Sequence, residues 1–196
     1  ALNWSAAAST HRNNAQNLPL PEATRIADAL VREGLLAVES PSDAPFRSVA
    51  IDMHAVLTSG GYDAPHRVSL RLHHITRFLR ACLWAKRAVR SQRLYTIACE
   101  LSEAKAQARN AGDVQRAIEL VAVFRRLRPY RFAARDQCLF HALALVKFLA
   151  HYDTFPTWVI AVRSRPWGAH SWVQMGDLVL DANPEEISGF TPILAI

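Results

Sequence analysis

Apolar residues recur at helical spacing through the middle of the chain. Between Val68 and about Arg90 they mark one face of a predicted helix, made of Leu72, Ile75, Phe78, Leu79, Cys82 and Leu83. The pattern predicts that this face packs against the core. A second helix is expected over Leu94 to Arg109. A third opens at Asp113, a typical N-cap residue, and ends before Pro129.

The pattern changes from helix to strand in the last third of the chain. Apolar residues at helical spacing follow Cys138, so we expect a helix that begins there. Three runs typical of strands come next, at residues 157–162, 169–175 and 178–182. A loop and a short final strand at 193–196 complete the chain. Helices followed by an antiparallel sheet predict an α+β fold, with a helical part packed on the sheet.

The first sixty residues have a weaker pattern. An amphipathic segment follows Pro21, and two short apolar runs at residues 34–38 and 49–51 come after it. A helix and two strands in this order form either part of a small winged-helix-like unit or an irregular extension of the main domain. Gly and Pro cluster in Thr58-Ser-Gly-Gly61 and at Pro65, which predicts the boundary and gives domains over residues 1–60 and 61–196.

A two-residue turn at 176–177, Gly followed by Asp, fixes the expected pairing of the last strands. Met175 then pairs with Leu178, and His170 and Asp181 lie on one face as diagonal neighbours, roughly 7–8 Å apart at Cα. A slip of one residue would place them on opposite faces. The face that carries His170 is expected to form a site. The other face is expected to be core and carries Val173, Met175, Leu178 and Leu180.

The three residues Cys138, His170 and Asp181 supply a nucleophile, a base and an orienting carboxylate in that order. A thiol becomes a good nucleophile as a thiolate, which a helix N-terminus and a nearby imidazole both favour. Asp181 would hold the imidazole of His170 in the useful tautomer. The sequence therefore predicts thiol chemistry, with the start of the helix at Cys138 meeting the face that carries His170.

Three further residues are candidates for the same site. The amide of Gln137 is a candidate donor to the developing oxyanion, although a residue there can equally face solvent. Trp172 and Trp167 are candidate substrate-binding residues, and simple sheet packing is the alternative for Trp172. The spacing of the Cys and His residues fits no zinc site, so no metal is expected.

Composition and charge narrow the class of protein. The chain has 196 residues, 51% of them hydrophobic, and a formal net charge of +6. Residues 71–128 hold thirteen Lys or Arg against four Asp or Glu, which implies an acidic partner. Three cysteines without metal-ligand spacing fit a reducing compartment. No apolar run reaches the length of a membrane span, so a cytoplasmic protein without a membrane partner is expected.

Four short segments resemble the C-terminal peptidase domain of the lasso-peptide B proteins, a group of papain-like and transglutaminase-like thiol enzymes. They are Cys138-Leu, Val162-Arg163 with Pro166 after it, Ala169-His-Ser-Trp-Val173, and Leu180-Asp181. The resemblance covers residues 68–196 and is specific over residues 135–183. It maps the catalytic Cys, His and Asp of that family onto Cys138, His170 and Asp181.

The resemblance implies hydrolysis of the bond between leader and core in a ribosomally made lasso-peptide precursor. It implies two partners, the precursor peptide and a cyclase resembling asparagine synthetase. No cofactor motif is present, so any ATP dependence would come through that cyclase. Residues 20–55 resemble the end of a winged-helix leader-recognition domain. Two alternatives remain: an acyltransferase of transglutaminase-like type, and a basic, non-catalytic module that binds peptide or, less expected, nucleic acid.

Overall fold

The computed structural model describes residues 48–58, 69–91, 93–108, 112–128 and 138–196. The chain divides into two compact units, 1–47 and 48–196, and every described residue belongs to the second. The helix and strand expected within residues 21–38 lie outside the described residues. Residues 49–51 lie beside the last strand without forming one, and the Val49 N–H donates to the Ala195 carbonyl at 2.8 Å.

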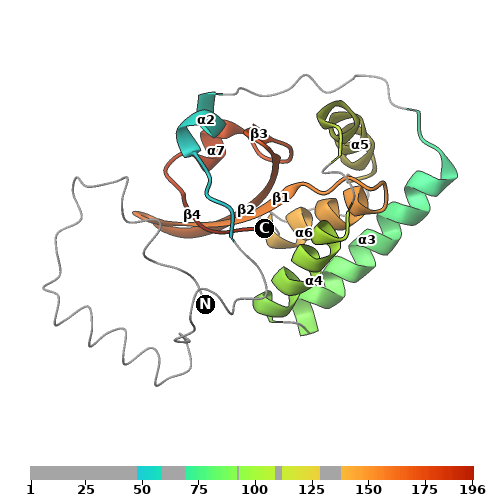
Figure 1. Ribbon diagram of the computed structural model, residues 1–196, viewed down its shortest axis with the longest axis horizontal. Coiled ribbons are helices and arrows are strands. Elements are labelled where there is room, and N and C mark those ends of the chain that lie inside the picture. The colour runs from blue at the N-terminus through green and yellow to red at the C-terminus, as the bar shows by residue number, and fades with distance from the viewer. Residues whose placement is uncertain (1–47, 59–68, 92, 109–111, 129–137) are drawn as a thin grey trace, which may run out of the picture. The chain divides into compact units, whose positions relative to one another are not determined.

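In the described ranges, four longer helices precede the sheet (Figure 1): α3 (Leu72–Ser91), α4 (Leu94–Ala106), α5 (Val114–Leu127) and α6 (Cys138–Ala150). The expected N-cap is confirmed, because Asp113 Oδ1 accepts the Gln115 N–H at 3.1 Å. Helix α6 is the most deeply buried, and both α3 and α5 contact it. The helix on which Cys138 lies is therefore the centre of the helical layer.

The face that α3 buries differs from the expected one. Its buried residues are Phe78, Ala81, Ala85 and Ala88, whereas Leu72, Ile75, Leu79 and Leu83 are exposed. Small side chains let two helix backbones approach closely, and α3 packs on α6 with this alanine-rich face. The prediction is confirmed for Phe78 and was wrong for the leucine and isoleucine positions, because alanines form the surface that packs on α6.

The sheet has four antiparallel strands in the order β3-β2-β1-β4, so the α+β prediction is confirmed. They are β1 (Thr157–Ser164), β2 (Trp167–Met175), β3 (Leu178–Val179) and β4 (Thr191–Ala195). The expected hairpin register is confirmed, since Met175 pairs with Leu178. Strand β3 is shorter than predicted and ends at Val179. Beyond it, the Leu180 N–H still donates to the Val173 carbonyl at 2.8 Å.

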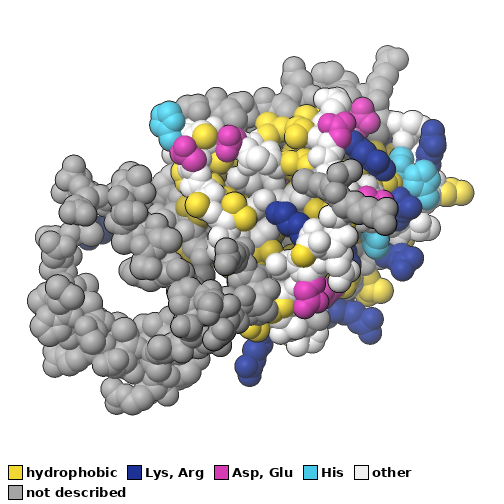
Figure 2. All heavy atoms as spheres, viewed as in Figure 1, with side chains coloured by type: hydrophobic (Ala, Val, Ile, Leu, Met, Phe, Trp, Pro, Cys, Tyr) yellow, Lys and Arg dark blue, Asp and Glu magenta, His cyan; other side chains and the backbone are white. Residues whose placement is uncertain are grey.

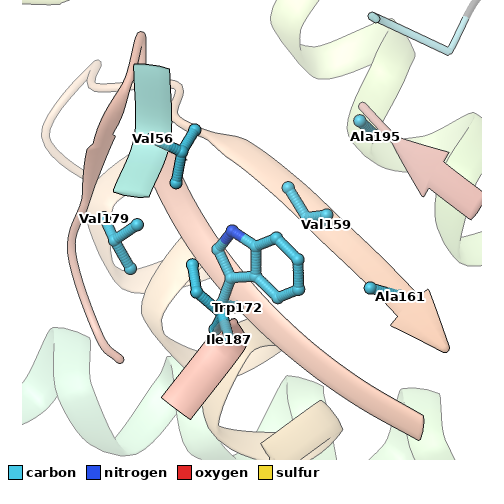
Figure 3. Packing of buried hydrophobic residues seen from close by; sticks show 7 residues of the cluster. All are labelled: Val56, Val159, Ala161, Trp172, Val179, Ile187 and Ala195. Atoms are coloured by element: carbon cyan, nitrogen blue, oxygen red, sulfur yellow. The ribbon is translucent and has the colours of Figure 1, made fainter. Parts of the chain in front are cut away.

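Apolar residues cover the face of the sheet that carries Trp172 (Figure 3). Val159 and Trp172 lie on this face, and they pack with Val56 of α2 (Met53–Thr58) and Ile187 of α7 (Pro184–Ile187). The opposite face is also buried, with Trp158 and Val173 fully covered, and α6 contacts both β1 and β2. The expected core face is therefore confirmed, since Val173, Met175 and Leu180 are buried. The face expected to form a site is also covered, by α2 and α7.

Helix α7 falls in the tail that was expected to be a loop. Asn183 is its N-cap, Pro184 opens it, and the Asn183 N–H donates to Glu186 Oε2 at 3.5 Å. Asn, Pro and then Glu at the third helical position is the pattern of a capping box with proline at the first turn. The sequence contains this capping pattern, but the apolar residues of the tail have little periodicity, and a loop was therefore expected.

None of the helices in the described ranges is long and apolar enough to cross a membrane.

Candidate active site

Cys138 is the first residue of α6, as the sequence predicted. Its side chain is partly exposed, whereas Leu143 and Leu149 further along the helix are fully buried. The first turn of a helix presents backbone N–H groups that have no partner within the helix. Gln137, the candidate oxyanion donor, lies outside the described residues.

His170 lies on β2, paired with Ala161 of β1, and is partly buried. Its ring stacks on Trp172, with centroids 6.2 Å apart and planes at 28°, and it contacts the Phe190 ring at 5.6 Å. Its Nε2 is buried and has no hydrogen-bond partner among the described residues. Leaving a buried polar atom unpaired costs about 1–3 kcal/mol, so this nitrogen is available to a partner group.

Burial lowers the pKa of His170 below its usual value, and the charge of Glu186 partly opposes that shift. The imidazole is therefore mainly neutral at neutral pH, which is the form that can accept a proton. Glu186 was not among the candidate residues. The capping-box pattern that predicts α7 would also have placed this carboxylate after the hairpin.

Asp181 completes the edge of β2 where β3 has ended. Its Oδ1 accepts the Val173 N–H at 2.7 Å and so takes the place of a strand carbonyl. Burial of the carboxyl group raises its pKa to about 7, against the opposing effects of the Val173 hydrogen bond, Arg125 and Arg128. Burial thus favours the neutral, protonated form of the group.

The three predicted catalytic residues stand on the expected elements, but the structure does not join them. Within the described part of the chain, no hydrogen bond links His170 to Cys138 or to Asp181. The carboxylate whose charge affects the pKa of His170 is that of Glu186. The assembly of Cys138, His170 and Asp181 into a triad remains a prediction.

The two candidate tryptophans have opposite surroundings. Trp172 is fully buried, and its Nε1 donates to Gln174 Oε1 at 2.8 Å. Trp167, at the start of β2, is 80% exposed. A fully buried indole offers no surface to a substrate, so Trp172 supports the ring of His170 instead. A substrate-binding role for Trp167 remains a prediction.

A hollow of about 1100 Å³ lies at the end of α6 away from Cys138. Its lining includes Lys147 and His151, and none of the candidate site residues. No group of three His, Cys, Asp or Glu side chains in the described ranges is arranged to hold a metal ion. The hollow is therefore separate from the site at which thiol chemistry is expected.

These features define an α+β domain with a cysteine at the start of its central helix and a histidine on its sheet. Residues 75–195 match the Transglutaminase-like superfamily. The match spans more than half of the chain, and the chain belongs to that superfamily. Its members include cysteine peptidases and acyltransferases, and the fold is usually enzymatic. No curated protein and no solved structure matched the chain.

Proposed function

We propose that this protein is a cysteine peptidase that removes the leader from a lasso-peptide precursor. One observation carries the proposal: Cys138 is the first residue of the central helix of a Transglutaminase-like domain. The matched region also contains His170 and Asp181. The narrower assignment to leader removal rests on the resemblance of residues 135–183 to the lasso-peptide B proteins.

In this proposal Cys138 Sγ attacks the carbonyl carbon of the bond between leader and core. His170 takes the thiol proton and passes it to the departing amine as the C–N bond breaks and a thioester forms. Water, deprotonated by the same imidazole, then hydrolyses the thioester and regenerates the thiol. The step requires Sγ and the imidazole within about 3–3.5 Å of each other. The buried Nε2 of His170, which lacks a partner in the described residues, supports this role.

The partners of the proposed reaction are peptides and proteins. The precursor peptide is the substrate, and an ATP-dependent cyclase of asparagine synthetase type closes the ring on the freed amine. The protein itself needs no cofactor in this scheme. We propose that it acts in the cytoplasm, where the precursor is made.

The test is to incubate the protein with the precursor peptide, with and without the cyclase and ATP, and to follow the masses of the products. Cys138→Ala should abolish cleavage while leaving the fold unchanged. Cys99→Ala is the matched control, because Cys99 is also partly exposed but lies on α4. Cleavage by the Cys138→Ala variant would contradict the proposal.

Acyl transfer is the second candidate, because the superfamily includes acyltransferases. Both reactions pass through a thioester on Cys138, and they differ in whether water or an amine accepts the acyl group. Adding a primary amine to the incubation separates them. If the acyl group is recovered mainly joined to the added amine, and not as the free acid, the result would favour acyl transfer.

A further inference from the structure

Helix α3 leaves a stripe of large apolar side chains in solvent. Leu72 is 83% exposed, Leu83 58%, Leu79 42% and Ile75 38%. These positions follow one another at three- and four-residue spacing and therefore lie on one side of the helix. From Leu72 to Leu83 the stripe is about 16 Å long, which is roughly three helical turns.

The same side of α3 continues into positive charge. Lys86 and Arg90 follow Leu83 at three- and four-residue spacing, and both are exposed. Exposed Arg80 and Arg87 lie along one border of the stripe, and the whole helix contains no Asp or Glu. Figure 2 shows hydrophobic and basic side chains together along the edge where Figure 1 draws α3. An apolar half and a basic half thus succeed each other along one helix.

Among the residues that the structure describes, this side of the helix is left exposed. Helix α3 packs through Phe78, Ala81, Ala85 and Ala88, which lie on its other side, and the stripe contains none of the candidate site residues. Contiguous exposed apolar surface beside charge is typical of a surface that another molecule covers.

We propose that this stripe, formed by Leu72, Ile75, Leu79, Leu83, Lys86 and Arg90, docks an acidic amphipathic helix of a partner polypeptide. Such a partner places leucine-like side chains against the apolar half and carboxylates against Lys86 and Arg90. The contact needs a partner helix of about three to five turns. The proposal does not depend on the peptidase function.

Charge and composition favour this partner over the other occupants. A second copy of the chain would bring its own Lys86 and Arg90 to a surface that is already positive. Nucleic acid would engage the cations and leave the four aliphatic side chains in water. Membrane-surface helices commonly carry aromatic residues on the apolar side. Here Trp84, the one Trp of α3, is partly buried and its Nε1 donates to Glu100 Oε1 at 3.0 Å.

The proposal is tested with a fluorescent synthetic peptide of about 18 residues, long enough for five turns. It carries Leu along one helix face and Glu at one end of that face. Fluorescence anisotropy with the whole protein should report saturable binding that weakens as salt rises from about 0.05 to 0.5 M. A peptide with Lys in place of every Glu should bind at least tenfold more weakly.

Matched variants assign the binding to the stripe. Leu83→Glu should weaken binding at least tenfold, whereas Val114→Glu, at an exposed position on α5, should leave it unchanged. Arg90→Glu should weaken it severalfold, and Arg116→Glu on α5 is its control. All four positions are exposed, and circular dichroism verifies the fold of each variant.

Four results would overturn the proposal. The first is no binding of the Glu peptide, and the second is equal binding of the Lys peptide. The third is tighter Leu83-dependent binding to duplex DNA or to vesicles of anionic lipid than to the Glu peptide. The fourth is self-association of the protein that Leu83→Glu abolishes. Vesicle co-pelleting measures the binding to lipid, and sedimentation measures the self-association.

Discussion

Asp181 and Glu186, two of the carboxylates that follow His170 in the chain, have different surroundings. Asp181 lies beside the end of β3 with its carboxyl group buried and bound to the Val173 N–H. Glu186 lies in the first turn of α7, exposed to solvent, and its charge raises the pKa of His170. Burial and hydrogen bonding therefore decide what a carboxylate does, whereas its order along the chain does not.

The difference bears directly on the proposed reaction. A carboxylate that orients an imidazole must be ionised, and burial favours the neutral form of Asp181. Glu186 is exposed, and solvent weakens the effect of its charge on His170. Substitutions in the two regions can show which of them supports His170.

Trp172 stacks on His170 and precedes Val173, whose N–H binds Asp181, so it supports both features. Trp172→Ala should lower the free energy of unfolding by about 3–5 kcal/mol, because it leaves a cavity and removes the partner of Gln174. Trp167→Ala should change it by less than about 0.5 kcal/mol. Urea unfolding measures both. Equal losses of unfolding free energy in the two variants would show that Trp172 is not buried.

Asp181 should make stability depend on pH in an unusual direction. The unfolded carboxyl group titrates near pH 4, and the folded one at about 7. Between these values the folded state holds a proton that the unfolded state has released, so stability falls as the pH rises from 4 to 7. Asp181→Asn keeps an acceptor oxygen for Val173 and cannot ionise.

The wild-type protein should therefore lose about 1–3 kcal/mol relative to Asp181→Asn between pH 4.5 and 8, measured by urea unfolding at both values. Asp177→Asn, in the exposed turn of the same hairpin, is the control and should follow the wild type. A wild-type protein that gains stability over the same interval would show that Asp181 is ionised and paired.

Glu186→Gln should lower the pKa of His170 further, since the charge of Glu186 raises it. The effect is the smallest of the three because the carboxylate is exposed. Titration of the His170 ring protons by NMR measures it, with Glu185→Gln as the neighbouring control. If Asp181→Asn produced the larger decrease, Asp181 and not Glu186 would be the carboxylate that supports the imidazole.

Local signals predicted much of this fold. The helix start at Cys138, the N-cap at Asp113 and the pairing of Met175 with Leu178 each depend on a few neighbouring residues. Such features are set by caps, turns and alternation, which the sequence displays directly.

The missed features depend on which elements meet. The alanines of α3 face the core because α6 lies close to them, and no pattern within α3 reveals that neighbour. Strand β3 ends early, so the side chain of Asp181 replaces a backbone acceptor for Val173. Val56 and Ile187 pack over Trp172, and these residues are far apart in the chain. The sequence predicted which helix or strand carries each candidate site residue, but it did not predict how these residues come together.

The central claim is that Cys138 is a nucleophile activated by His170. Its most direct test is the rate at which iodoacetamide alkylates each cysteine between pH 5 and 9, resolved by peptide mass mapping. Cys82 and Cys99 are internal controls, because all three cysteines are partly exposed. We expect Cys138 to react fastest at neutral pH and to lose that advantage in His170→Ala. Equal rates at the three cysteines, or a Cys138 rate unchanged by His170→Ala, would contradict the claim.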